Sequence, residues 1–367
     1  MRVQPSQLVS GCVLLTDVMG KTHKPIVQKN TVLTEQHILL LQKFLIETVD
    51  VSGKLSDGKE FVPKMAEQEK NTKKTATSEL SSSYPDSFEE HYDQVVANYK
   101  KMFTSWQSNV AIDMPLARQL LIPLFERVDT TNSAVYTLHH YATKKDYFYH
   151  HCVSVGILSA YLAKKMGYKK GEWLQVGLAG FLCDSGMAKI DPSIVTKTSA
   201  LNLTELEEIK KHPTYSYRLV EHIPTITKAV KLAVLQHHER RDGSGYPLGL
   251  AKRKIHMYAR IIAVCDMYHA MTCERLYKEK LSPFKVIEEI QKEQYSKLDP
   301  EVVQLFIESL SNFSIGTRVK LSNNKIAEIV FVESKQPTRP MVRLDGENEI
   351  ITLKNESSLY INEILGN

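Results

Sequence analysis

The chain has 367 residues, of which 43% are hydrophobic and 24% are charged. These proportions exclude a wholly disordered, collagenous or coiled-coil protein and predict a globular one. The formal charge of +5 results from 47 basic and 42 acidic residues that are interspersed along the sequence. Because no basic arm or stripe stands out, the sequence predicts no DNA or RNA binding, whereas a small anionic ligand is compatible with it.

The longest uncharged apolar stretches are Val9–Leu15 and Gln175–Cys183. Both fall well short of the roughly 18 residues that a membrane-spanning helix requires, so we expect no contact with a membrane. The five cysteines form no CxxC pair. An odd number of cysteines in a large chain argues against a disulfide framework and predicts a location in the reducing cytoplasm.

The N-terminal part of the sequence divides into two regions. In residues 1–52, β-branched runs at Ile26-Val27 and Thr31–Leu33 precede a helix signal at residues 34–46, which predicts a small α/β module. Residues 53–87 are rich in Lys, Glu and Ser and poor in aliphatic side chains. Such a segment buries too little apolar surface to offset its ordering entropy, so we expect a polar linker.

A long helical region and a short β region follow. Residues 88–312 show apolar side chains at three- and four-residue steps, which predicts amphipathic helices and a mainly α fold. Residues 313–367 alternate between apolar and polar side chains and contain turn signals, which predicts a small C-terminal β domain. The expected strands are Thr317–Leu321, Ala327–Val332, Met341–Leu344 and Glu349–Leu353.

Ten of the thirteen histidines lie between His139 and His269. Within this region we select six candidate metal ligands, each at or near the end of an apolar helical run: His151, Asp184, His212, His237, His238 and Asp266. Imidazoles and carboxylates coordinate divalent transition metals, and six such groups exceed one tetrahedral site. Any one of these histidines alone could equally be a surface or capping residue.

The six residues together predict a binuclear site. His237 and His238 would point about 100° apart on a helix and could serve two neighbouring metals, with Asp184 as the bridge between them. Two metals roughly 3.5–4 Å apart are a common device for hydrolysing phosphoesters. A loop follows directly, in which Gly243 and Gly245 permit turn conformations and Pro247 fixes the exit.

Residues 146–310 resemble the HD-GYP domain family. The resemblance rests on the run from His237 to Leu250, which reads HHERRDGSGYPLGL, and on three further segments at the spacing of the family. These segments are Ala259–Asp266, Arg275–Lys278 and Leu298–Pro300.

The resemblance implies a bacterial helical phosphohydrolase that cleaves cyclic di-GMP or a related nucleotide with two divalent metal ions, of Fe, Mn or Zn. It assigns Asp184 to catalysis as well as to metal binding. By the same resemblance, Gly245, Tyr246 and Pro247 border the substrate, and Arg275 and Lys278 meet its phosphate. A signalling partner protein and a homo-oligomer are compatible with this family.

The motif that names the family departs from its usual form. The family has His-Asp-x-Gly-Lys, whereas this chain has Cys183-Asp184-Ser185-Gly186-Met187. Cys183 could replace the imidazole as a thiolate ligand, or it could be a small buried apolar residue. Met187 offers neither charge nor proton in place of the lysine, and Lys189 lies on a different face.

Two further positions differ from those of some members. His269 stands where the family usually has aspartate, three residues after Asp266, and could be an extra ligand, a residue that supports a ligand, or a surface residue. Tyr147 stands where some members carry a glutamate for a third metal, so we expect no trinuclear site.

Two functions are therefore compatible with the sequence. The first is a metal-dependent cyclic di-GMP phosphodiesterase, impaired to some degree by the loss of the motif His and Lys. The second is a catalytically degenerate protein that signals by binding a nucleotide or a partner protein. The fold is the same in both.

Overall fold

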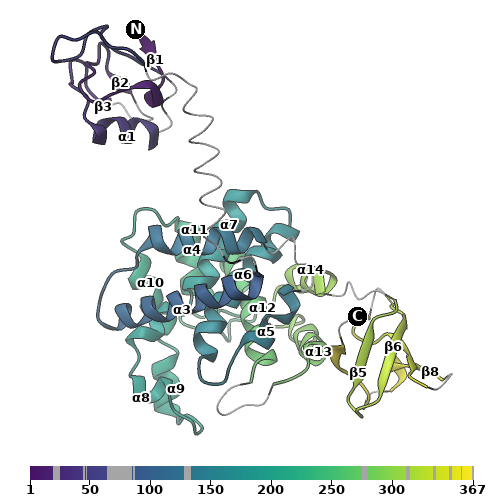
Figure 1. Cartoon of the computed structure of the whole chain (residues 1–367). Coiled ribbons are helices and arrows are strands. Elements are labelled where there is room, and N and C mark those ends of the chain that lie inside the picture. The colour runs from purple at the N-terminus through teal and green to yellow at the C-terminus, as the bar shows by residue number, and fades with distance from the viewer. Residues whose placement is uncertain are drawn as a thin grey trace. The chain divides into compact units, whose positions relative to one another are not determined.

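The computed structural model describes residues 1–365, apart from residues 20–24, 44–45, 47, 64–84, 86, 128–133, 275–279, 311–314, 334–335, 347–348 and 357. The chain divides into two compact units, Met1–Pro85 and Asp86–Asn367. Figure 1 labels most of the helices and strands of both units. None of the helices in the described part combines the length and the hydropathy of a bilayer-spanning segment.

The first unit is a small α/β structure. β1 (Arg2–Val3) pairs antiparallel with β4 (Val49–Asp50), and β2 (Val18–Met19) pairs antiparallel with β3 (Pro25–Val27). The helix signal of the sequence corresponds to α1 (Glu35–Lys43).

The first unit also includes residues that the composition assigned to the linker. An isolated bridge joins Lys54 to Glu60, and the side chain of Phe61 is buried in the same core as Leu14 and Leu33. The polar residues of this hairpin lie on the surface, and the single phenylalanine anchors it. The predicted linker residues 64–84 and 86 lie outside the described residues.

The described residues of the second unit are mainly helical up to residue 310, and the predicted mainly α class is confirmed. Its helices are α3 (Phe88–Gln107), α4 (Met114–Arg127), α5 (Ala134–Tyr141), α6 (Tyr147–Lys165), α7 (Lys170–Leu182), α8 (Pro192–Val195), α9 (Leu203–Ile209), α10 (His212–Val220), α11 (Lys228–Gln236), α12 (Met257–Thr272), α13 (Pro283–Glu293) and α14 (Pro300–Leu310). The short 3-10 helices η3 (Ser185–Lys189) and η4 (Lys252–Lys254) connect some of them.

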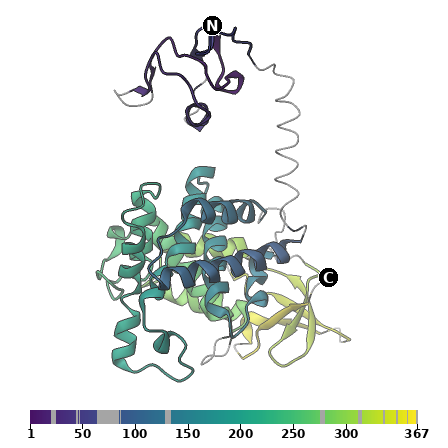
Figure 2. The same cartoon turned by 60° about the vertical axis from the view of Figure 1, so that its left-hand side comes forward.

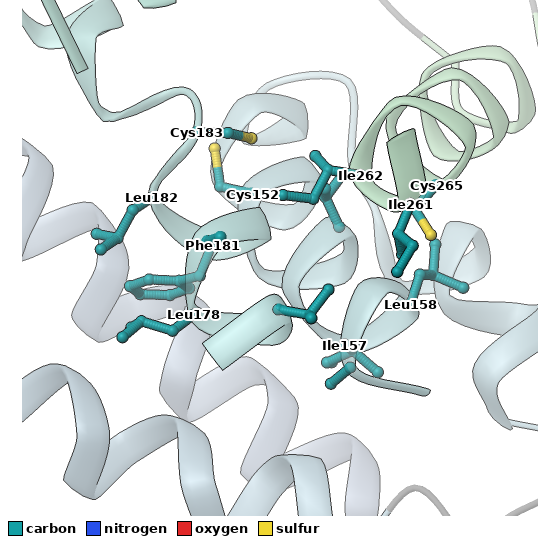
Figure 3. Close-up of a cluster of buried hydrophobic side chains, with 14 of the residues drawn as sticks. Cys152, Ile157, Leu158, Leu178, Phe181, Leu182, Cys183, Ile261, Ile262 and Cys265 are labelled. Carbon is teal, nitrogen blue, oxygen red and sulfur yellow. The ribbon is translucent and has the colours of Figure 1, made fainter. Parts of the chain in front are cut away.

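Helix α6 lies at the centre of this unit (Figure 1) and contacts α3, α7 and α12. Figure 2 shows the helices of this unit from a second direction. Every residue from His150 to Ala163 is buried, as expected for a helix that is apolar on all faces. Its crossing with α7 is close, because a Cβ added at Gly177 would lie 2.7 Å from the Cβ of Ala160. Figure 3 shows the apolar side chains that α6, α7 and α12 contribute to this core.

The C-terminal β domain is an antiparallel sheet in the order β8-β7-β6-β5-β9. Its strands are β5 (Arg318–Leu321), β6 (Ile326–Phe331), β7 (Met341–Leu344), β8 (Ile350–Thr352) and β9 (Ile361–Leu365). The first four agree with the expected strands to within one residue at every end. β9 was not predicted, because Ile-Asn-Glu-Ile-Leu has no regular alternation, and its pairing with the distant β5 defines it.

The β domain is joined to the helices through α13. Phe284 of α13 is buried in the core of the β domain. Arg339 forms a two-pronged ion pair with Glu288 of the same helix, at 2.5 and 3.0 Å. Since α13 thus supplies both an apolar and an ionic contact, the sheet packs against the helical core (Figure 1).

Candidate metal centre

The six candidate ligands come from five separate helical segments, and the structure brings them together. Their positions are His151 on α6, Asp184 between α7 and η3, His212 at the start of α10, His237 and His238 at the end of α11, and Asp266 on α12. All are buried except His238, which is half-buried. Within the described chain, they fall into two groups of possible ligands that share Asp184.

The first group, which we call the His-rich group, consists of Asp184, His212, His237 and His238. The Nδ1 atoms of His212 and His237 lie 2.7 and 2.8 Å from the backbone carbonyls of Ile209 and Val234. A carbonyl only accepts hydrogen bonds, so each Nδ1 carries the proton and each neutral ring has a bare Nε2.

These bare nitrogen atoms face each other. The two Nε2 atoms are 3.1 Å apart, and they lie 3.0 Å (His212) and 3.4 Å (His237) from Oδ1 of Asp184. Three atoms with lone pairs therefore converge in a buried space, where they would repel one another unless a cation lay between them. The chemistry of this donor set fits a divalent transition metal.

The second group, which we call the His151 group, consists of His151, Asp184 and Asp266. Nε2 of His151 lies 3.0 Å from Oδ1 of Asp266 and 3.5 Å from Oδ2 of Asp184. Asp184 therefore directs one carboxylate oxygen to each group. This arrangement allows it to bridge two ions, but the His151 group has only three ligands.

The charges of these residues suit metal binding. Burial opposes the ionised form of Asp184, but the adjacent imidazoles of His151, His212 and His237 outweigh it and hold the pKa of this carboxyl well below its usual range. The pKa of Asp266 is lowered in the same way, against burial, above all by its hydrogen bond from His151. Burial keeps the pKa of His238 well below its usual value, so this imidazole is neutral.

His151 gives a testable pH dependence. Burial lowers its pKa, but the hydrogen bonds to Asp184 and Asp266 outweigh it and raise the pKa to about 9. In metal-free protein the proton on His151 thus stabilises the fold fully below about pH 6.5 and less as the pH rises through about 9. A metal must displace this proton, so we expect affinity for Mn²⁺ at the His151 group to increase about tenfold per pH unit between these values.

Titration of metal-stripped protein with Mn²⁺ in a calorimeter, in buffers of different ionisation enthalpy, measures both the affinity and the proton released. An affinity that stays constant from pH 6.5 to 9 would show that His151 is not a ligand.

Cys183 is not in either ligand group. Its Sγ donates a hydrogen bond to the carbonyl of Gly180 at 3.1 Å, and its side chain lies in the apolar core near Cys152 (Figure 3). Burial holds the pKa of this thiol well above its usual value. Of the two alternatives that the sequence left open, this geometry corresponds to the small buried residue rather than the thiolate ligand.

The motif lysine has no substitute among its neighbours. Met187 is half-buried and packs against the hydrophobic core. The amine of Lys189 donates to the carbonyl of Trp106 at 2.5 Å and to Oδ1 of Asn109 at 2.7 Å. Lys189 thus fixes the C-terminal end of α3 and is not directed at the metal centre.

His269 is buried, so the surface alternative is wrong for this residue. Its Nδ1 lies 3.1 Å from Nδ1 of His151. The hydroxyl of Tyr147 also lies near Nδ1 of His151, at 3.3 Å. With Nε2 of His151 directed at the carboxylates, its Nδ1–H can donate to His269. Such a contact fixes the ring orientation of a metal ligand.

The loop after the histidine pair closes over the His-rich group. The Tyr246 ring lies 4.8 Å from the ring of His238, between centroids. Gly245 is in close contact with the backbone, because an added Cβ would lie 2.4 Å from the nitrogen of Arg240. Pro247 follows a cis peptide bond. Arg275 and Lys278, the other predicted substrate residues, lie outside the described residues.

Sequence reasoning missed Glu239. Its buried carboxylate accepts hydrogen bonds from the backbone nitrogens of Leu248 and Leu250, both at 2.7 Å, and thereby holds the two ends of the loop together. The available signal was an acidic residue directly after the histidine pair and before a glycine-rich loop, where backbone donors need an acceptor.

Gly186 fixes the distance between Asp184 and His212. Its nitrogen donates to Oγ of Ser216 at 2.7 Å, and an added Cβ would lie 2.2 Å from the carbonyl of His212. We expect Gly186→Ala to push η3 away from α10, to cost about 1–3 kcal/mol of stability and to weaken metal binding. Urea denaturation and metal analysis measure both effects.

Gly171→Ala is the matched control, since nothing lies within 4 Å of a Cβ at this exposed position on α7. If Gly186→Ala and Gly171→Ala had the same stability and the same metal content, the contact between η3 and α10 would not matter for the metal centre.

Comparisons with known proteins point to a domain family for this part of the chain. Residues 137–302 match the family model of the HD domain. Cyclic di-GMP phosphodiesterase PA4108 of Pseudomonas aeruginosa is 29% identical over 243 residues, which cover 66% of this chain and 58% of that protein. Cyclic di-GMP phosphodiesterase PdeB of Borreliella burgdorferi is 31% identical over 208 residues, with coverages of 57% and 55%.

A third relative is named for a different nucleotide. The 3'3'-cGAMP-specific phosphodiesterase 1 of Vibrio cholerae is 29% identical over 171 residues, which cover 46% of this chain and 39% of that protein. The chain spans about half the length of the first two relatives. The buried His/Asp centre, built on helix ends, lies within the residues that match the HD domain. Residues 137–302 are thus similar to the HD domain family, and the Gly-Tyr-Pro loop within them is the segment that resembles the HD-GYP group.

Proposed function

We propose that this chain is a metal-dependent phosphodiesterase that hydrolyses cyclic di-GMP to a linear dinucleotide or GMP. The observation that carries this proposal is the pair of ligand groups sharing Asp184, one of which brings the Nε2 atoms of His212 and His237 within 3.1 Å of each other. Relatives named cyclic di-GMP phosphodiesterases support the choice of substrate.

The residues divide the work of binding. The His-rich group and the His151 group would hold two divalent ions of Fe, Mn or Zn, which when bound supply the positive charge that polarises a phosphodiester toward attack by water. Asp184 belongs to both groups and would therefore fix their positions relative to each other. Gly245, Tyr246 and Pro247 form the wall beside His238 where a nucleotide would lie, and we propose that Arg275 and Lys278 bind its phosphate.

Two experiments test the proposal on the full chain. Elemental analysis should find a transition metal after purification or reconstitution, and the double variant His237→Ala/His238→Ala should lose it. Chromatography of reaction mixtures should then show cleavage of cyclic di-GMP by wild type, with 3'3'-cGAMP as the comparison substrate. A chain that binds less than about half an equivalent of any metal contradicts the binuclear centre.

A second function is favoured by a specific observation. Cys183 contributes no ligand and Met187 contributes no cation, so the centre lacks two groups that the family motif supplies. The alternative is a protein that binds the nucleotide or a partner protein and signals without hydrolysis. Metal-loaded protein that binds cyclic di-GMP stoichiometrically but leaves it intact would establish this alternative.

We also assign the protein to the bacterial cytoplasm. All five cysteines are buried free thiols, which is the state expected in a reducing compartment.

A further inference from the structure

A pocket separate from the metal centre lies at the base of the Gly-Tyr-Pro loop, and none of the six candidate ligands lines it. Its volume is about 410 Å³. Four cationic side chains line it, together with two carboxylates: Arg241, Lys252, Arg253, Arg260, Asp299 and Glu301. We call it the basic pocket.

The charges in the basic pocket do not cancel. Arg260 pairs with Asp299 at 3.1 Å, and both of these side chains are largely buried. In the described part of the chain, Arg241, Lys252 and Arg253 form no ion pair with any carboxylate. Glu301 is exposed and is the one other acidic group in the lining. Three cations therefore face one carboxylate.

Asp299 is not available to a ligand. Besides its ion pair with Arg260, its Oδ1 accepts hydrogen bonds from the backbone nitrogens of Glu301 at 3.1 Å and Val302 at 3.4 Å, at the start of α14. The carboxylate thus holds Arg260 in place and leaves the remaining cations without a counterion.

We propose that the basic pocket binds a small polyanion with two linked phosphate groups, either free pyrophosphate or the diphosphate of a nucleotide. Arginine forms two-pronged hydrogen bonds with phosphate, and two arginines and a lysine match the charge of such a ligand. The lining contains no aromatic ring on which a base could stack and, besides Pro300, no apolar residue. Recognition therefore rests on the phosphates.

The pocket is placed to act on the metal centre. Arg241 and Lys252 stand at the two ends of the loop, where the nitrogen of Lys252 donates to the carbonyl of Arg241 at 3.1 Å and Asp242 bridges to Ala251. The same loop places Tyr246 against His238. A polyanion bound to both Arg241 and Lys252 would hold the two ends of the loop together. Binding itself does not depend on the proposed phosphodiesterase activity.

Calorimetric titration of the full chain with pyrophosphate tests the proposal. Because a metal centre also attracts pyrophosphate, the key samples are metal-stripped wild type and Asp184→Asn, both of which should still bind one equivalent. GDP should bind the same samples, and tighter binding of GDP than of pyrophosphate would identify a nucleotide as the source of the diphosphate.

Two substitutions remove cations without touching the metal centre. Lys252 has φ +48°, a conformation that glycine adopts easily, so Lys252→Gly keeps the backbone of the loop. Arg253→Ala removes the neighbouring exposed cation. We expect each to weaken pyrophosphate binding about tenfold, the loss expected from one hydrogen bond to a charged group. Lys101→Ala, at an exposed position on α3, is the matched control and should bind as wild type.

Two results would overturn the proposal. One is the absence of stoichiometric binding to the metal-stripped chain. The other is binding that disappears in Asp184→Asn yet is unchanged in Lys252→Gly and Arg253→Ala, which would place the anion on the metals.

Discussion

The double variant Cys183→His/Met187→Lys is expected to hydrolyse cyclic di-GMP about 100-fold faster than wild type, the order of magnitude that one positioned electrostatic group contributes. Cys183 directly precedes Asp184, and its thiol is turned to the carbonyl of Gly180, so the His151 group has three ligands. Histidine at 183 would offer a fourth, and lysine at 187 would return a cation beside the phosphate.

The controls separate the two changes. Met187→Leu keeps an apolar side chain of similar size and should leave turnover unchanged, whereas Met187→Lys alone should raise it. Cys183→His alone should raise metal content, measured by elemental analysis. Since Cys183 is buried near Cys152, circular dichroism must first show that the imidazole is accommodated.

Two outcomes have a clear meaning. A folded, metal-loaded double variant without any gain supports the signalling function, because the nucleotide pocket must then have diverged elsewhere. Wild-type turnover that decreases in Cys183→His would show that the thiol acts as a ligand after all, against the geometry described above.

The second large effect is expected from Asp184→Asn. Asp184 is the residue that both ligand groups of the described chain share, so this variant should retain neither metal ion. We expect the affinity for each metal ion to fall by more than about 100-fold. Loss of a residue that only supports a ligand already lowers metal affinity by up to about 100-fold. Asp266→Asn removes a ligand from the His151 group alone and should retain one ion, in the His-rich group.

Elemental analysis after dialysis against a fixed concentration of Mn²⁺ measures both variants. Asparagine keeps the size of the side chain, so the comparison isolates the carboxylate charge. Loss of metal should also lower the melting temperature, because an ion that binds only the folded state stabilises it. Retention of one ion by Asp184→Asn would show that the groups do not share this residue.

The sequence by itself determined the class of the protein and its candidate ligands. Apolar periodicity predicted the helical core, alternation predicted β5 to β8, and the run from His237 to Leu250 indicated the family. These are local signals, since the side-chain spacing of a helix or strand and the order of a motif are both legible over a few residues.

The tertiary structure decided everything that depends on contacts between distant segments. β9 exists because it pairs with β5, some forty residues earlier in the chain, and Phe61 belongs to the first unit because it finds a core there. The division of the ligands into two groups and the direction of the Cys183 thiol follow from how α6, α7, α10 and α12 pack. No local pattern encodes these distances, because burial and packing arise between elements rather than within them.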